Sequence, residues 1–270
     1  MPEGHVIHRL ASRFGDEFAG RRVRVSSPQG RFAAQAAEVD GSVLADAQAY
    51  GKHLFVRFDA PEPSEVHIHL GLIGKLRFVP VDEIASPQTV RLRIDNGTVA
   101  AELRGPQTCS LVTSAERDAV VAGLGPDPLR PDADPQLAWD RVHRSGRAIA
   151  SLLLDQRIAA GVGNIYRAEV LFRQRIDPAT PGNQVGRRAW DRVWADLVAL
   201  MADGVAKGRI DTVRPEHSPE AQGRPPRVDP HGGEVYVYRR AGQPCLVCGR
   251  PVSERLVESR RIFWCQKCQH

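Results

Sequence analysis

The chain has 270 residues, of which 42% are apolar and 26% charged, and its formal charge is +5. This composition is typical of a soluble globular protein with one large or two ordinary domains, and no run approaches the roughly 18 apolar residues of a membrane span. The amino terminus lacks the basic-then-apolar layout of a secretory signal, so we expect a cytoplasmic protein whose positive charge favours a polyanionic partner.

The chain starts with Met1, Pro2 and Glu3. Methionine before a small residue is normally removed, which would leave Pro2 as the amino terminus. An α-amino group has a pKa of about 7.7–8.0, so this secondary amine is partly uncharged near neutral pH and can attack a carbonyl carbon or a sugar C1′. Glu3 is placed to transfer protons in the same site. From these residues alone, an ordinary second residue and a solvated carboxylate remain the commoner interpretation.

The next part of the chain predicts one helix and then strands. Val6, Leu10 and Phe14 recur every four residues and predict a helix that Gly15 ends. Short, partly alternating apolar runs predict strands, and Asn96-Gly97 predicts a hairpin. These runs cover residues 23–25, 54–58, 66–70, 76–78 and 90–94.

Two features of the strand region suggest chemistry. Lys52 follows Gly51 at the start of a strand, although a lone surface lysine is usually only solvated. Leu72 lies on a glycine-flanked turn, where it can either wedge into a stack of nucleic-acid bases or pack inwards. His67 and His69 share a strand face but have no further ligands in view, so we expect no metal site there.

Composition changes at residues 123–128, which cannot continue a helix or a central strand. Beyond them, apolar spacing predicts helices over 148–155, 164–172 and 189–206, followed by a loop over 214–233 and a strand over 234–239. Asn164 follows a Gly-Val-Gly turn and is predicted to cap the next helix, where bare backbone amides attract phosphate. An ordinary helix–helix corner is an equally good interpretation of this motif alone.

Four of the five cysteines form two pairs near the carboxyl end. Cys245-x-x-Cys248 and Cys265-x-x-Cys268 have the spacing of a four-thiolate zinc site, which closes the metal shell and is structural. Cys109 stands alone. Arg255, Arg260 and Arg261 lie between the pairs, so one zinc ion would stiffen a basic hairpin suited to nucleic acid.

Together these motifs resemble the formamidopyrimidine-DNA glycosylase and endonuclease VIII family of base-excision repair enzymes. The resemblance runs from end to end and rests on residues 2–4, 51–52, 69–71, 125–129, 153–156, 161–164, 245–249, 259–260, 263–265 and 268–269.

The resemblance implies an α+β fold with two domains. The first is a catalytic β-sandwich with a flanking helix over residues 1–122, followed by a linker over 123–133. The second is a helix-two-turns-helix DNA-binding region over 134–233, which ends in a zinc hairpin over 234–270. Damaged double-stranded DNA would lie across the cleft between the domains. We expect a monomer with one structural Zn²⁺ ion, no small-molecule cofactor and no membrane partner, which associates with the nucleoid when it acts on DNA.

The resemblance also implies roles for single residues. Pro2 would be the nucleophile, Glu3 the proton donor to the opening sugar, Lys52 the acid for β-elimination, and Arg260 the group that serves δ-elimination and grips phosphate. His69 and Asn164 would hold the phosphates that flank the lesion. The remaining two assignments are Leu72 as the wedge and Glu169 as a buried carboxylate near the active site.

The substrate branch follows from what the chain lacks. The purine-specific branch of the family carries an Arg-Arg-Phe element, whereas Arg104–Cys109 here contains none. The run around Arg260 and Trp264 is closer to endonuclease VIII. We therefore expect excision of oxidised pyrimidines, with an 8-oxoguanine enzyme and a non-catalytic zinc-containing DNA-binding protein as alternatives.

Overall fold

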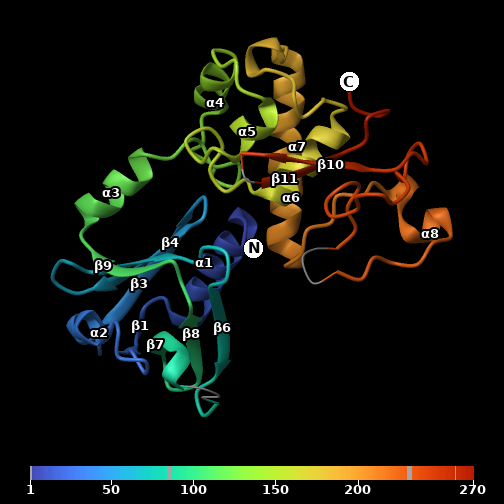
Figure 1. Ribbon diagram of the computed structural model, residues 1–270. Helices are drawn as coiled ribbons and strands as arrows, with labels where there is room; N and C mark the ends of the chain where they lie inside the picture. Colours follow the sequence, from blue (N-terminus) through green and yellow to red (C-terminus); the bar gives the residue numbers. More distant parts are fainter. Residues whose placement is uncertain (1, 84–86, 230–232, 259) are drawn as a thin grey trace. The chain divides into compact units, whose positions relative to one another are not determined.

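The computed structural model describes residues 2–83, 87–229, 233–258 and 260–270. The chain folds as two compact units, Met1–Gly123 and Leu124–His270 (Figure 1). Unit 1 holds two antiparallel sheets and unit 2 is mainly helical with a terminal β-hairpin, which confirms the expected α+β fold. Among the helices that the structure describes, none has both the length and the apolar character needed to cross a membrane.

The two sheets of unit 1 form the β-sandwich. The five-stranded sheet has the order β1 (Arg21–Arg22), β3 (Val43–Tyr50), β4 (His53–Asp59), β5 (Glu65–His69) and β9 (Thr108–Val112). The four-stranded sheet has the order β2 (Arg24–Ser26), β7 (Val90–Asp95), β8 (Val99–Arg104) and β6 (Lys75–Pro80). Because β5 and β6 belong to different sheets, the turn between them connects the two layers.

The described part of unit 1 also contains the α-helices α1 (Gly4–Phe18), α2 (Ala33–Val39) and α3 (Ser114–Ala122), with a 3₁₀ turn at Pro87–Thr89. The prediction that α1 ends at Gly15 was wrong. Phe18 is fully buried and its ring lies 5.6 Å from that of Phe14 and 6.0 Å from that of Phe78. A glycine inside a helix costs about 1 kcal/mol, less than the burial of one phenylalanine contributes.

The strands predicted for unit 1 were found, but β1, β3, β9, α2 and α3 were not predicted. The sequence of β3, VLADAQAY, interleaves small and polar residues, and most of them are only half-buried. Such a strand lacks a strong apolar alternation, so only its pairing with β4, from Val43 opposite Asp59 to Tyr50 opposite His53, identifies it.

Unit 2 is built around α6 and α7. Its helices are α4 (Pro135–Val142), α5 (Ile149–Leu154), α6 (Asn164–Arg173), α7 (Arg187–Lys207) and α8 (Pro219–Gln222), with 3₁₀ turns at Gly182–Gln184 and Pro215–His217. The strands β10 (Ser253–Val257) and β11 (Arg260–Trp264) form the terminal hairpin. All residues of α6 from Asn164 to Phe172 are buried, so α6 is the central helix of this unit.

Two of the segments predicted for unit 2 have another secondary structure. Residues 234–239 form turns instead of a strand, because three of their backbone amides bond to the carboxylate of Glu169. The predicted loop over 214–233 contains a 3₁₀ turn and the short helix α8, whose Ser218 side chain accepts a hydrogen bond from the amide of Ala221.

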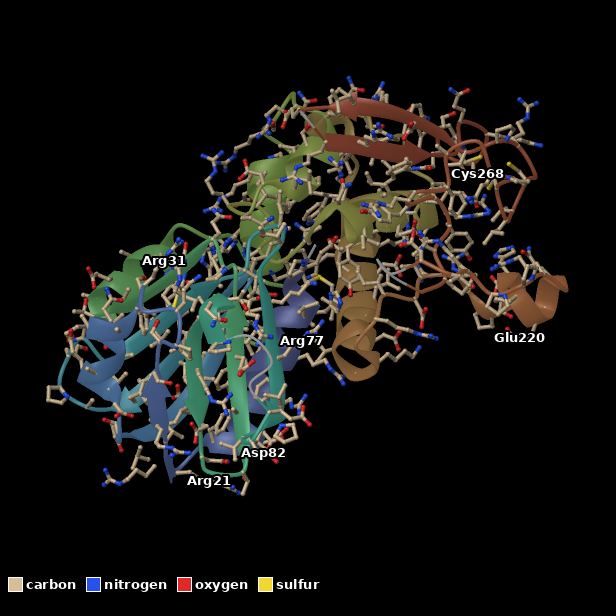
Figure 2. The ribbon with its side chains drawn as sticks, turned by 60° about the horizontal axis from the view of Figure 1, so that its bottom comes forward. Arg21, Arg31, Arg77, Asp82, Glu220 and Cys268 are labelled. Carbon is tan, nitrogen blue, oxygen red and sulfur yellow. The ribbon has the colours of Figure 1, made fainter. Side chains whose placement is uncertain are left out.

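Charged side chains cover the surface of unit 1. Arg21, Arg31, Arg77 and Asp82 are all exposed and point away from the sandwich in Figure 2. The core between the sheets is apolar, and most of the charged side chains of this unit lie at the surface.

Candidate functional site

Pro2 and Glu3 lie directly before the first helix of unit 1. Pro2 is half-buried, and Glu3 has no solvent exposure at the N-cap position of α1. The positive end of a helix favours a carboxylate and disfavours an ammonium group. A solvated Glu3 is therefore excluded. The expected removal of Met1 concerns a position outside the described residues.

Lys52 lies at the tip of the hairpin that joins β3 to β4. Tyr50 and His53 face each other across this turn, and Gly51 has the left-handed φ of +60° that the turn needs. The charge of Lys52 contributes to lowering the pKa of both His53 and His69, so its ammonium group lies close to both rings.

Three histidines form a cluster on β4 and β5. His53 Nδ1 lies 2.9 Å from His67 Nε2, and the ring centroids of His53 and His69 are 4.8 Å apart. Burial lowers the pKa of His53 and of His67 to about 4, with further lowering from neighbouring charges. All three imidazoles are therefore neutral near pH 7, since burial also lowers the pKa of His69.

One buried polar atom of His69 has no hydrogen-bond partner among the described residues. This atom is Nδ1. A buried nitrogen without a partner is uncommon, and this one lies close to the charge of Lys52.

The tip after β5 exposes two apolar side chains. Leu72 is 58% exposed and Ile73 is 79% exposed. Gly71 has a φ of +67°, and a Cβ at Gly74 would overlap the carbonyl of Leu70, so the turn requires glycine at both ends. Of the two interpretations given above, inward packing of the tip is excluded.

The turn before α6 differs from the prediction. Gly163, not Asn164, is the N-cap residue, and Asn164 is the first residue of the helix. The amide of Gly161 is not bare either, because it donates a 3.0 Å hydrogen bond to Gln156 Oε1. Asn164 is nearly buried and its Oδ1 accepts a hydrogen bond from Arg167, a fully buried arginine one turn further along α6.

Glu169 is a fully buried structural anchor. Its carboxylate accepts hydrogen bonds from the amides of Tyr236, Val237 and Tyr238 at 2.7, 2.9 and 2.8 Å. The hydroxyl of Thr212 donates a further bond of 2.5 Å. With four donors around it, this carboxylate holds the segment that leads into the cysteine module.

The four cysteines gather into one candidate metal centre. All of their sulfur atoms lie within 4.8 Å of one another, with Cys245 and Cys268 at 3.9 Å and Cys248 and Cys265 at 3.4 Å. A zinc–sulfur bond of about 2.3 Å gives a tetrahedron with edges of roughly 3.8 Å, so the donor set fits one ion that closes its shell.

Arg260 begins strand β11 and is exposed at the tip of the hairpin, opposite Val257. Ser259, part of the motif that carried the resemblance, lies outside the described residues. The hairpin therefore presents a guanidinium group at its exposed end, while Ile262 and Phe263 of the same strand are buried against unit 2.

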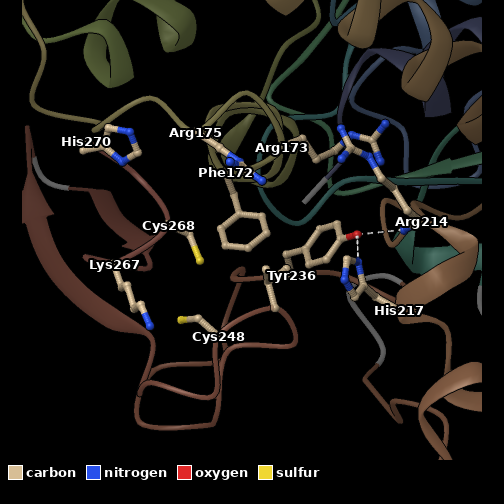
Figure 3. A pocket seen from close by; sticks show the side chains of 11 residues that line it. Phe172, Arg173, Arg175, Arg214, His217, Tyr236, Cys248, Lys267, Cys268 and His270 are labelled. Atoms are coloured by element: carbon tan, nitrogen blue, oxygen red, sulfur yellow. Dashed lines mark hydrogen bonds between the residues drawn. The ribbon is translucent and has the colours of Figure 1, made fainter.

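A cavity of about 270 Å³ borders the cysteine centre (Figure 3). Its lining combines aromatic, basic and cysteine side chains: Phe172, Arg173, Arg175, Arg214, His217, Tyr236, Val247, Cys248, Lys267, Cys268 and His270. Among the described residues, no aspartate or glutamate side chain lines it. Basic side chains stabilise thiolates, so these cations suit the charge of a metal-bound cysteine cluster.

The predicted site residues thus fall into two groups. Unit 1 holds Pro2, Glu3, Lys52, His69 and Leu72. Unit 2 holds the remaining ones: Asn164, Glu169, Arg260 and the four cysteines. The sequence did not identify His53 or Arg167 as site residues. His53 follows Lys52 in the sequence, but its proximity to His69 depends on the register of β4 with β5, which the sequence does not give.

Two family domains match the chain. The formamidopyrimidine-DNA glycosylase N-terminal domain matches residues 1–107, and the H2TH domain of the same enzymes matches residues 124–214. A relative named "Endonuclease 8 1" from Mycobacterium tuberculosis is 48% identical over 100% of both chains.

Solved structures share the fold. The MutM (Fpg) protein of Thermus thermophilus has a TM-score of 0.75 at 27% identity, covering 99% of this chain and 98% of its own. The Fpg of Lactococcus lactis, solved with DNA that contains an abasic site, has a TM-score of 0.78 at 19% identity and covers 99% of both chains. The protein is an enzyme of the DNA glycosylase class, and it belongs to the formamidopyrimidine-DNA glycosylase and endonuclease VIII family.

Proposed function

We propose that this protein is a bifunctional DNA glycosylase and abasic-site lyase that excises oxidised pyrimidines through a Schiff base on Pro2. The observation that carries the proposal is the complete burial of Glu3 beside Pro2, at the positive end of α1. A carboxylate that is buried directly beside the candidate nucleophile is placed to exchange protons with the sugar that the nucleophile attacks.

The amine of Pro2 acts once Met1 has been removed. The positive end of α1 disfavours the protonated amine and so favours the nucleophilic form. Its nitrogen attacks C1′ of the damaged nucleotide, the glycosidic bond breaks, and the base leaves with the bonding electrons and takes up the proton that the nitrogen releases. Glu3 gives a proton to O4′ as the sugar ring opens and an iminium ion forms.

Strand cleavage follows from the iminium ion. It acidifies the hydrogens on C2′, and loss of one of them expels the 3′ phosphate in a β-elimination, with Lys52 as the acid. A second elimination, served by Arg260, expels the 5′ phosphate. The neutral histidines beside Lys52 leave its ammonium group as the local positive charge, which suits both phosphate binding and proton donation.

DNA binding is distributed over phosphate contacts in both units. In this proposal His69 and Lys52 bind phosphate in unit 1, while Asn164 and Arg260 bind it in unit 2. The structure of the Lactococcus lactis relative with abasic DNA supports such a partner. A base inside a duplex must be extruded for this chemistry, and the exposed Leu72 fills the vacated stack.

The proposal of oxidised pyrimidines as substrates is based on the turn after β5, on the segment Arg104–Cys109 and on the name of a relative. The exposed side chains of the turn are Leu72 and Ile73, and the segment Arg104–Cys109 lacks the Arg-Arg-Phe element of the purine-specific branch. The name of the Mycobacterium tuberculosis relative also favours the endonuclease VIII branch.

Four cysteines hold one Zn²⁺ ion in this proposal: Cys245, Cys248, Cys265 and Cys268. The ion stabilises the fold around it and takes no part in the reaction. The hairpin that carries Arg260 follows directly from this centre.

A side-by-side nicking assay tests the proposal. Single-turnover rates are measured on duplexes with thymine glycol, dihydrouracil or 8-oxoguanine, for the natural chain and for Glu3→Gln. Faster nicking of the oxidised pyrimidines, with loss of base release in Glu3→Gln, is the expected result. Preference for 8-oxoguanine would assign the purine branch, and unchanged activity in Glu3→Gln would remove the role of the carboxylate.

A further inference from the structure

Arg167 is a fully buried arginine at the centre of unit 2. Its Nη2 donates to Oδ1 of Asn164 and, over 3.0 Å, to the backbone carbonyl of Arg261. Its Nη1 donates to the carbonyl of Ala150 over 3.3 Å. One guanidinium group therefore joins the start of α6, helix α5 and strand β11.

This contact decides how the Asn164 amide is oriented. An asparagine side chain has one acceptor end and one donor end, which usually cannot be told apart without their partners. A guanidinium group only donates, so the oxygen of Asn164 faces Arg167 and its NH₂ group faces away. The outward end thus offers hydrogens, which suit an acceptor such as a phosphate oxygen.

The second contact fixes the zinc hairpin against α6. The carbonyl of Arg261 belongs to the residue after Arg260, at the start of β11. A hydrogen bond to this backbone position holds the strand at the point where the Arg260 side chain leaves it. The same buried arginine thereby sets the position of both proposed phosphate contacts of unit 2.

We propose that Arg167 is a positioning residue for DNA binding, which orients the Asn164 amide towards phosphate and fixes the base of Arg260. The inference rests on the proposed function in that Asn164 and Arg260 contact DNA. Lysine cannot replace Arg167, because its ammonium is a single point charge without the planar fork that reaches three acceptors at once.

Asn164→Asp tests the orientation of the amide. The aspartate keeps the oxygen that faces Arg167, and pairing with the guanidinium group should maintain the melting temperature. It replaces the outward NH₂ by a second oxygen that repels phosphate. The dissociation constant is measured for a duplex with an uncleavable tetrahydrofuran site, so that no chemistry is needed. We expect binding about tenfold weaker than the natural chain, and weaker than Asn164→Ala.

Arg167→Lys tests the link to the hairpin, with Arg173→Lys as the matched control. Arg173 lies on the same helix and forms a two-point ion pair with Asp196, but it contacts neither Asn164 nor β11 in the hydrogen bonds of the described residues. Arg167→Lys should speed amide hydrogen exchange in residues 260–264 and weaken DNA binding about tenfold, since one phosphate contact is lost and another misplaced. Arg173→Lys should do neither.

A double-mutant cycle completes the test. If Arg167 acts through Asn164, the effects of Arg167→Lys and Asn164→Ala on the dissociation constant are not additive. Additive effects, or normal binding by Asn164→Asp, would overturn the inference. Because binding to the uncleavable duplex does not require Pro2, these results stand apart from a failure of the proposed Schiff-base chemistry.

Discussion

The carboxylate of Glu169 accepts a 2.9 Å hydrogen bond from the backbone amide of Val237. The amides on either side of Val237 donate to the same carboxylate, so three successive residues wrap around one buried charge. This arrangement replaces the pairing that a β-strand would have supplied. It also connects the central helix α6 to the chain that enters the cysteine centre.

Glu169→Gln is expected to lower the free energy of unfolding of unit 2 by about 2–4 kcal/mol. The glutamine NH₂ would meet backbone donors instead of accepting from them, and an unsatisfied buried donor costs about 1–3 kcal/mol. Urea unfolding measures the change. Glu38→Gln, an exposed position on α2, is the control and should differ from the natural chain by less than about 0.5 kcal/mol. Equal stability of both variants would contradict the role of Glu169.

Unit 1 should lose stability in acid through its histidine cluster. The pKa of His53 and of His67 is about 4 in the folded chain, below the ordinary value of 6.5, chiefly because of burial. The unfolded chain therefore binds more protons below pH 6.5, and the stability present above that pH is lost as the pH falls towards 4. His67→Gln should flatten this dependence. Imidazole NMR titrations with midpoints near 6.5 in the folded protein would contradict the account.

Removal of the metal should affect one part of unit 2. Each chain should contain one zinc ion, and chelation should speed hydrogen exchange in residues 245–268, because a hairpin of this size has too small a core to fold alone. Cys248→Ser should lose the metal, whereas Cys109→Ser should keep it, since Cys109 lies on β9 of unit 1 and is not one of the four clustered cysteines. Full metal content in Cys248→Ser would rule out the four-cysteine site.

Leu72→Ala should reduce nicking of a lesion in duplex DNA about tenfold and leave a single-stranded substrate unaffected, because only a stacked duplex needs a wedge. Stability should change by less than about 0.5 kcal/mol, since the side chain is exposed. Ile73→Ala is the control at the neighbouring position. An equal loss of duplex nicking in both variants would show that Leu72 is not the specific wedge.

Local patterns predicted much of the fold. The apolar spacing of α1, α6 and α7 and the runs of β4 to β7 were visible in the sequence, as was the Cys-x-x-Cys pairing. Features that depend on contacts between residues far apart in the sequence were not predicted. The apolar pattern of residues 234–239 predicts a strand. In the structure, three of their backbone amides donate to the carboxylate of Glu169, which is far away in the sequence, so they are not available for sheet pairing.

The residues of the candidate site also divide into those that a local motif predicted and those that depend on distant contacts. The sequence predicted Pro2, Lys52 and Asn164 as site residues because each belongs to a short motif. His53 and Arg167 could not be found in this way, because their roles follow from the register of β4 with β5 and from the packing of α6 against β11. Neither the strand register nor the helix packing can be predicted from a local sequence pattern.

The central claim is that the nitrogen of Pro2 bonds to deoxyribose during turnover. Its most direct test is borohydride reduction of the enzyme on thymine glycol duplex, followed by mass spectrometry of the digested adduct. The account predicts one reduced crosslink, on a Pro2 that has lost Met1, and none in a chain that retains the methionine. A crosslink on Lys52, or activity from a chain with an intact Met1, would contradict it.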